Sequence, residues 1–257
     1  MRIHHEPLTD VTRYLESFRD LRLEDKEEHF RSYLRALESY KRIDAGTRIL
    51  EVGTGIGWFP LLCQRHGLTC KGLEISPRLV EYARQWGRQY GLEPDIELGN
   101  IEESDIGSGL YDVIIASSVF EHIEHWRPAL QRIHRALRPG GALFFESSNK
   151  FSLTSGEFHL PLYGWLPDRV RYWLRRRLQG GDIMKLGIDF HQFTYPQLRR
   201  AFRQAGFTEI YDRVDMATLE YVSRAWKKRL VRAAKRSRAV KALALTFADV
   251  TRFVCVK

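Results

Sequence analysis

The stretch of sequence that decides the fold is Arg48-Ile49-Leu50-Glu51-Val52-Gly53-Thr54-Gly55-Ile56-Gly57-Trp58. Its apolar first half predicts a buried strand, its three glycines predict a tight turn, and the apolar residues 61–63 after it predict a helix. Glycine accepts positive φ and carries no Cβ, so a ligand can approach the main chain, while the first N–H groups of the helix offer donors. The stretch therefore predicts a strand-turn-helix unit that binds a ligand at its turn.

The spacing of the glycines narrows the class of ligand. A dinucleotide-binding turn has the pattern G-x-G-x-x-G, but this chain has G-x-G-x-G, and Trp58 stands where the third glycine of the dinucleotide pattern falls. The next predicted strand, 68–74, ends in Glu74, about 20 residues after the turn, where a carboxylate can accept both hydroxyls of a ribose. We therefore expect a nucleoside ligand without a diphosphate bridge.

Strands and helices alternate through the rest of the chain. Ser76 with Pro77 and Thr194 with Gln197, the second pair a capping box, mark the starts of two helices. Because each motif falls at the carboxyl end of a strand, the pattern indicates an α/β fold with a doubly wound sheet that binds its ligand at that edge. Strands are predicted at 48–52, 68–74, 96–98, 111–118, after the turn at 137–141, at 207–214 and at 251–256.

These motifs resemble those of the class I S-adenosylmethionine-dependent methyltransferases, in particular methyltransferase domains of types 11 and 23 and the O-methyltransferases of quinone biosynthesis. The resemblance implies a Rossmann-like seven-stranded sheet whose last strand inserts antiparallel between strands five and six. It also implies S-adenosyl-L-methionine as the methyl donor and S-adenosyl-L-homocysteine as the product. The residues that the resemblance assigns to the cofactor are Glu51, Gly53, Thr54, Gly55, Gly57, Glu74, Ile75, Asn100, Ile101, Ser117 and Ser118.

Two of these assignments concern the adenine ring. In the resembling enzymes, a polar side chain and an apolar neighbour after strand three contact adenine. By this resemblance Asn100 binds the exocyclic amine and Ile101 the ring face. An ordinary strand-end turn is the alternative for both residues.

The length of the chain suits one methyltransferase domain, 1–257, with elaborations. Two amphipathic helices are predicted before the first strand, and they either cover the substrate or only complete the core. A long aromatic insertion after strand five is predicted to be the acceptor-binding cap. The predicted parts are the N-terminal helices 1–45 (8–24 and 27–41), the cofactor-binding core 46–150, the cap 151–192 and the C-terminal part of the sheet 193–257 with a basic helical segment 221–246.

Transfer of a methyl group from a sulfonium is an in-line displacement, so the protein must chiefly align donor and acceptor. A hydroxyl acceptor also needs a base that takes its proton. His122, just after strand four, is the first candidate, because the ordinary pKa of histidine is about 6.5. His159 in the cap is the second candidate. A His122 that merely caps its helix is the alternative.

A sharper interpretation of the same residues adds a divalent metal. Some O-methyltransferases, including those of quinone biosynthesis and those that act on small-RNA 3′ ends, carry E-x-x-E-H here and bind a cation that acidifies the acceptor hydroxyl. Glu121 and His122 match the last two positions, but Ser118 stands in place of the first glutamate. Two ligands seldom hold a metal, so a third would have to come from His159 or His191, and we do not expect a metal cofactor.

The net charge of +9 is confined to one segment. Residues 221–246 hold nine basic and no acidic residues, and the remaining 32 basic residues equal the 32 acidic ones. The three cysteines form no C-x-x-C pair, and we expect neither a leader peptide nor a membrane-spanning run. We therefore expect a cytoplasmic protein whose basic segment meets an anionic partner, either a membrane surface or a nucleic acid.

Three functions fit these observations. The first is an O-methyltransferase for a small-molecule or lipid-linked acceptor, with the basic segment on anionic lipid and Trp226 and Leu230 inward or interfacial. The second is an RNA methyltransferase that uses this segment and the cluster Arg175–Arg177 on phosphates. The third is a non-catalytic interaction module, against which the filled cofactor motifs argue. We prefer the first, because the bases form one helical segment away from the predicted cleft.

Overall fold

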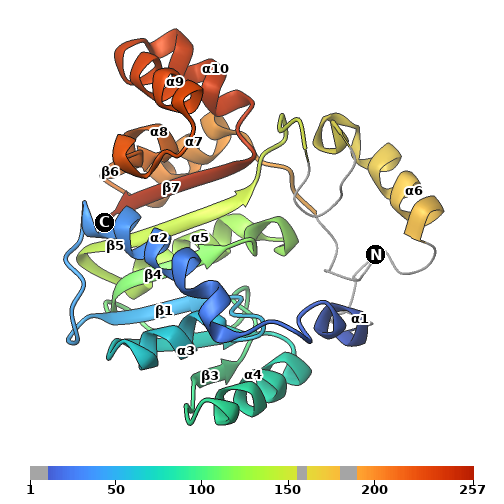
Figure 1. Ribbon diagram of the computed structural model, residues 1–257, viewed down its shortest axis with the longest axis vertical. Coiled ribbons are helices and arrows are strands. Elements are labelled where there is room, and N and C mark those ends of the chain that lie inside the picture. The colour runs from blue at the N-terminus through green and yellow to red at the C-terminus, as the bar shows by residue number, and fades with distance from the viewer. Residues whose placement is uncertain (1–10, 155–160, 180–189) are drawn as a thin grey trace.

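The computed structural model describes residues 11–154, 161–179 and 190–257, and it shows a seven-stranded sheet between two layers of helices (Figure 1). The strand order is β3-β2-β1-β4-β5-β7-β6, with β1 to β5 parallel and β7 antiparallel to both of its neighbours. The prediction of a doubly wound sheet with its last strand between strands five and six is confirmed. The strands are β1 (Arg48–Val52), β2 (Thr69–Glu74), β3 (Asp95–Leu98), β4 (Tyr111–Ser117), β5 (Leu137–Ser148), β6 (Glu209–Asp212) and β7 (Val250–Val256).

The helices begin where their capping signals are strongest. The Ser76 hydroxyl accepts the N–H of Leu79, and the Thr194 hydroxyl accepts the N–H of Gln197, as the sequence predicted. The helices and 3-10 turns are α1 (Val11–Glu16), η1 (Leu23–Lys26), α2 (Glu27–Glu38), α3 (Trp58–Arg65), α4 (Pro77–Gln89), η2 (Phe120–His122), α5 (Trp126–Ala136), η3 (Tyr163–Trp165), α6 (Asp168–Gln179), α7 (Tyr195–Ala205), α8 (Arg213–Met216), η4 (Leu219–Tyr221), α9 (Ala225–Arg236) and α10 (Arg238–Thr246).

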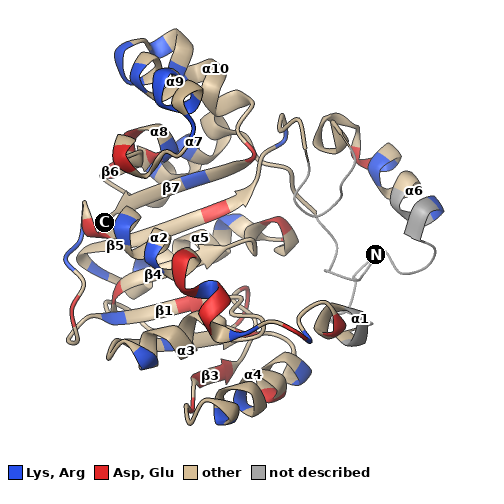
Figure 2. Ribbon diagram, in the orientation of Figure 1, with Lys and Arg blue, Asp and Glu red and all other residues tan. Residues whose placement is uncertain are grey.

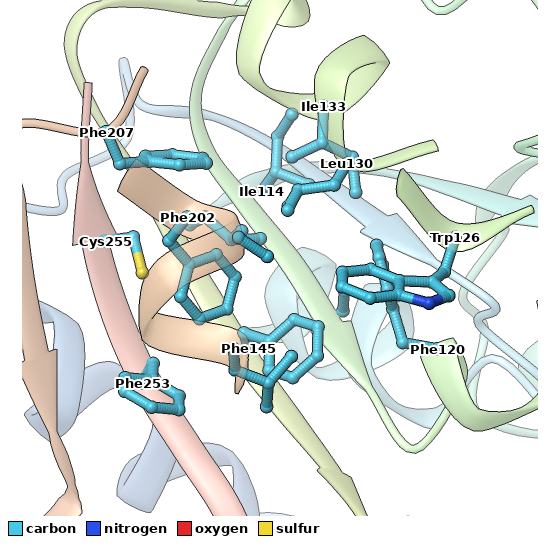
Figure 3. Close-up of a cluster of buried hydrophobic side chains, with 14 of the residues drawn as sticks. Ile114, Phe120, Trp126, Leu130, Ile133, Phe145, Phe202, Phe207, Phe253 and Cys255 are labelled. Atoms are coloured by element: carbon cyan, nitrogen blue, oxygen red, sulfur yellow. The ribbon is translucent and has the colours of Figure 1, made fainter. Parts of the chain in front are cut away.

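Alternate residues of each central strand face opposite layers of helices. On one face, Ile114 of β4 and Phe145 of β5 pack with α5 and α7 through residues such as Leu130 and Phe202 (Figure 3). On the other face, the alternate strand residues pack with α2, α3 and α4. Because both faces are covered, the open part of the sheet is its carboxyl edge, beyond which α1 and α6 lie (Figure 1).

The sixth strand is shorter than the predicted 207–214. It ends at Asp212, because the carboxylate of this residue accepts the N–H groups of Val214 and Asp215 and so starts α8. Asp215 in turn accepts the N–H of Asp212, which completes a capping box. The predicted end of the strand was therefore wrong by two residues.

The N-terminal helices are also shorter than 8–24 and 27–41. After α1 the chain turns, and a new 3-10 turn starts at Leu23, where Asp25 accepts the N–H of Arg22. This turn leads into α2. Residues 8–10 of the predicted first helix lie outside the described residues.

The basic segment forms two helices and not the predicted one. Ser237 ends α9 in an extended conformation (φ −127°, ψ 121°), and its hydroxyl accepts the N–H of Val240 at the start of α10. Within the described ranges, no helix combines the length and the apolar character that crossing a bilayer requires.

Candidate functional site

The glycine-rich loop between β1 and α3 lies at the carboxyl edge of the sheet. Gly53, Gly55 and Gly57 have φ angles of +69°, +57° and +77°, which is left-handed backbone that favours glycine. A Cβ on Gly53 would lie 2.5 Å from Cγ2 of Val119, so this glycine lets the loop touch the segment after β4. Around Gly55, by contrast, the nearest other atom to such a Cβ is a hydroxyl 3.5 Å away. The loop is therefore packed at Gly53 and open at Gly55.

Glu74, at the end of β2, is hydrogen-bonded to the glycine-rich loop. Its carboxylate is buried and accepts the N–H of Gly55 at 2.7 Å and the N–H of Ser76 at 3.0 Å. Burial raises the pKa of this carboxyl, and the N–H groups of Ser76, Gly55 and Ile75 oppose that rise. A carboxylate has about four lone-pair sites, so these N–H groups leave accepting capacity for a ribose hydroxyl.

Glu51 lies beneath the same loop. It is 5% exposed, and the hydroxyl of Thr54 donates to its carboxylate. Burial raises the pKa of Glu51 to about 8, against the hydrogen bond from Thr54 and with the help of the negative charge of Glu74. Near pH 7 the Glu51 carboxyl is therefore largely protonated, and it supports the loop as a hydrogen-bonding group.

Tyr14 of α1 lies beside the loop, a position that sequence reasoning missed. Its hydroxyl is the group 3.5 Å from the Cβ position on Gly55. Burial raises the pKa of Tyr14 to about 12, with Glu74 and Glu51 acting in the same direction, which places its hydroxyl near both carboxyls. The available signal was an aromatic residue with a polar tip in an amphipathic helix just before the first strand.

Asn100 and Ile101, which the sequence predicts to contact adenine, lie in the turn that follows β3. The Oδ1 atom of Asn100 accepts the N–H of Glu102 at 2.9 Å, and Ile101 is 5% exposed, within the core cluster that contains Leu73. Ile75, after β2, is half-buried. A role for these residues toward adenine stays a prediction.

Ser117 and Ser118 form the tip of β4 and take different conformations. Ser118 is exposed and has φ +54°, which is uncommon for a residue other than glycine and is frequent at functional sites. The Ser117 hydroxyl lies 2.6 Å from the Tyr33 hydroxyl of α2 and 3.5 Å from the Glu146 carboxylate of β5, which pairs with Arg252 of β7. Helix α2 is thus bonded to the tip of β4 through Tyr33, whose ring also lies 5.8 Å from that of Trp58 at the end of the glycine-rich loop.

His29 of α2 stands next to this network. Its ring lies 4.8 Å from the Tyr33 ring and 5.2 Å from the Trp58 ring, centre to centre. Partial burial lowers the pKa of His29, against the attraction of Glu146, so the imidazole is neutral near pH 7 and can accept a proton. Sequence reasoning missed His29, Tyr33 and Arg252, because only the packing of α2 and β7 brings them to the edge.

The predicted base His122 closes η2, four residues after Ser118. It is half-buried, and its backbone N–H donates to the Val119 carbonyl at 3.0 Å. Its role as a base stays a prediction. The second candidate, His159, lies outside the described residues.

Two residues of the metal hypothesis bond to protein groups. The Glu121 carboxylate is 2% exposed and accepts the hydroxyl of Ser147, while His191 donates from Nε2 to the Glu124 carbonyl at 3.0 Å. Among the residues that the structure describes, no three His, Cys, Asp or Glu side chains form a group that could hold a metal ion, and His159 lies outside them.

The side chains at the tip of β5 bind different partners. Glu146 lies beside Ser117, but Ser147 bonds to Glu121, and the side-chain amide of Asn149 donates to three carbonyls at the end of α10. Asn149 therefore anchors the basic segment, a role that the sequence did not indicate.

The described part of the cap, predicted as an irregular stretch, contains helix α6. Arg171 is fully buried, donates to Asp168 at 2.9 Å and lies over the ring of Tyr163. It is therefore a core residue of the cap. The side chains of Arg175 and Arg176 lie outside the described part.

Comparison with known sequences places the chain beside methyl-transferring proteins. A family model described as a methyltransferase domain matches residues 9–211. A ubiquinone biosynthesis O-methyltransferase of Methylocella silvestris is 28% identical over 136 residues, 51% of this chain and 52% of the relative. Its counterpart from Paramagnetospirillum magneticum is 27% identical over 165 residues, 62% of this chain and 65% of the relative. The chain thus spans about half the length of the first relative.

Solved structures share the fold at low identity. Phosphoethanolamine N-methyltransferase 2 of Haemonchus contortus, in complex with phosphomonomethylethanolamine and S-adenosylhomocysteine, has a TM-score of 0.60 at 16% identity, over 96% of this chain and 58% of that one. An S-adenosylmethionine-dependent methyltransferase of Mesorhizobium loti has a TM-score of 0.56 at 16% identity, over 93% and 99% of the two chains. At such identity, these likenesses establish the Rossmann-like fold.

Proposed function

Because the chain belongs to the methyltransferase domain family, whose class I members use S-adenosylmethionine, we propose that it transfers the methyl group of this donor to a hydroxyl oxygen of an apolar small-molecule or lipid-linked acceptor. The observation that carries the proposal is the hydrogen bond between Glu74 and the N–H of Gly55. Among the described residues, no atom beyond the chain neighbours of Gly55 lies within 3.4 Å of its Cβ position, and the Glu74 carboxylate can accept a further hydrogen bond. The bound donor supplies a methyl group that its sulfonium already activates.

The residues at the loop hold the donor. Glu74 receives a ribose hydroxyl, Gly55 lets the nucleoside lie against the main chain, and Glu51 with Thr54 keeps the loop in its left-handed conformation. Tyr14 covers the loop and excludes water from it. These contacts align the donor, which is the main contribution that methyl transfer needs.

The acceptor side rests on different residues. A hydroxyl loses its proton as it attacks, and the candidate bases are His122, after the β4 tip, and His29 on α2, whose pKa partial burial lowers. The apolar class of acceptor is supported by the aromatic cap and by the relatives named as ubiquinone biosynthesis O-methyltransferases. RNA is the alternative acceptor, which would be bound through the basic segment and Arg175–Arg177.

The test uses the purified chain, methyl-labelled S-adenosylmethionine and a whole-cell extract that contains both lipid and RNA, with mass spectrometry of the products. We expect label in an apolar compound as an acid-stable methyl ether. Label confined to RNA or to nitrogen would overturn the proposal.

A matched pair of variants tests the assigned base. His122→Gln should lower kcat by about 100-fold or more and leave binding of S-adenosylhomocysteine unchanged. His125→Gln, an exposed neighbour three positions further on, should keep the wild-type kcat. Equal rates for both variants would remove His122 from the mechanism.

A further inference from the structure

Helices α9 and α10 form the basic helix pair, 225–246, at the end of the molecule beyond β6 and β7 (Figure 1). The pair carries eight Lys and Arg and no acidic residue, and Figure 2 shows the basic residues gathered along α9. We propose that the outer face of this pair docks on an anionic phospholipid bilayer. The proposal goes beyond methyl transfer and does not depend on it.

Helix α9 exposes apolar side chains to solvent, although contact with water does not stabilise them. Trp226 is 57% and Leu230 is 40% exposed, and with Ala233 they follow one side of the helix at about 3.6 residues per turn. Ala234 is buried and faces the protein. Ala234 lies one turn after Leu230, so the apolar side of α9 is exposed at Trp226, Leu230 and Ala233, here called the outer stripe, and meets the protein at Ala234.

Three arginines lie along one side of the outer stripe. Arg229, Arg232 and Arg236 are exposed, and helical spacing puts them on adjacent positions, next to Trp226 and Leu230. A strip of aromatic and aliphatic side chains bordered by cations is the arrangement of a helix that lies in the plane of a bilayer interface. The cations meet lipid phosphates while Trp and Leu enter the boundary of the acyl chains.

Most of these bases are available to a partner. Lys241 is the exception, because it is paired with Asp212 at 2.8 Å and Asp215 at 2.5 Å and so attaches α10 to α8. Within the described ranges, Arg229, Arg232 and Arg236 form no ion pair. The protein therefore neutralises the base that faces inward and leaves the outer ones for an external anion.

The apolar surface continues from α10 to the cap. Leu243 is 61% exposed, Phe247 follows it one turn later, and the Phe247 ring stacks on Trp165 of η3 with 6.1 Å between ring centres. Asn149 fixes the end of α10 to the β5 tip. A bilayer that holds the basic helix pair thus also meets one side of the cap.

Exposed aliphatic residues favour lipid over nucleic acid as the partner. An RNA strand offers phosphates to arginines and a base to Trp226, but Leu230 and Leu243 gain nothing from either. In the bilayer interface the same leucines leave water, which is favourable in proportion to the apolar area buried. A lipid bilayer can therefore contact both the charged and the apolar side chains of this surface.

The test is co-sedimentation of the full chain with vesicles of phosphatidylcholine, pure or with about a third of phosphatidylglycerol, without any cofactor. We expect binding to the anionic vesicles only. Each base near an anionic surface contributes about a fivefold factor, so Arg229→Gln, Arg232→Gln and Arg236→Gln together should weaken binding on the order of 100-fold. The pair Trp226→Ala and Leu230→Ala should weaken it about tenfold.

A matched triple variant controls for bulk charge. Arg42→Gln, Arg88→Gln and Arg203→Gln remove three exposed bases outside the pair and should leave vesicle binding within about threefold of wild type. Equal losses in the two triples would overturn the proposal. So would salt-sensitive binding of wild type to single-stranded RNA without binding to anionic vesicles. Methyl transfer enters no arm of this test, so its failure leaves the proposed function intact.

Discussion

The ionisable side chains at the carboxyl edge of β1 and β2 are buried, whereas those on the outer face of α9 are exposed. Glu51 and Glu74 are buried, and hydroxyl or backbone N–H groups of the same loops satisfy them. On α9, Arg229 and Arg232 are exposed to solvent. Buried charge ties local geometry to stability and to ligand chemistry, whereas exposed charge contributes little to the fold and serves association. Substitutions at the carboxyl edge should therefore lower stability or ligand binding, whereas substitutions on the outer face of α9 should weaken association.

The largest effect on stability is expected at Gly53. In Gly53→Ala, the new Cβ meets Val119 at 2.5 Å and φ stays at +69°, so the free energy of unfolding should fall by about 3 kcal/mol. Gly67→Ala is the control, because φ is +71° there and nothing lies within 4 Å, and strain alone should cost about 1 kcal/mol. Denaturant titration measures both, and equal losses would show that the loop is not packed on the β4 segment.

The second-largest loss of stability is expected within the basic helix pair. Lys241→Met removes the partner of the buried Asp212 and should cost about 2 kcal/mol, because Arg199 remains 3.3 Å from that carboxylate and limits the loss. Arg238→Met removes an exposed base of the same helix and should change stability by less than about 0.5 kcal/mol. If both variants were neutral in thermal unfolding, the distinction between paired and outer bases would be lost.

A smaller and pH-dependent effect is expected at Glu51. Burial raises its pKa to about 8 from the ordinary 4.5, so the folded chain binds a proton there that the unfolded chain has released. The stabilisation is complete below the ordinary value and is lost as pH rises toward 8, with a slope of at most about 1.4 kcal/mol per pH unit.

Glu51→Gln tests that slope. The amide oxygen still accepts the Thr54 hydroxyl, but the side chain does not titrate. Between pH 5 and 8, the free energy of unfolding should therefore fall less steeply with pH in the variant than in wild type. The difference between the two slopes corresponds to about one bound proton. Parallel curves for the two proteins would mean that Glu51 is ionised throughout.

Local sequence signals predicted the parts of the fold whose causes are local. The strand 48–52, the glycine-rich turn, and the caps at Ser76 and Thr194 each depend on residues within one turn of chain, and the structure has them as predicted. The end of β6 and the break in the basic segment were missed, although the capping signals of Asp212 and Ser237 stand in the sequence.

Other parts could not be predicted from local signals. The hydroxyls of Tyr33 and Ser117 are 84 positions apart in the chain and meet only because α2 packs across β4. Arg252 reaches Glu146 only through the antiparallel pairing of β7 with β5. The acceptor side of the candidate site is built from such long-range contacts, whereas its donor side follows one contiguous motif and the next strand.

Calorimetric titration with S-adenosylhomocysteine tests the donor site most directly. Wild type should bind, Glu97→Gln on the exposed side of β3 should bind equally, and Glu74→Gln should bind about 100-fold more weakly, because a buried carboxylate that accepts a ribose hydroxyl is lost. Thermal unfolding of each variant shows whether it is folded. Absence of heat with well-folded wild type, or equal affinity in wild type and Glu74→Gln, would contradict the account.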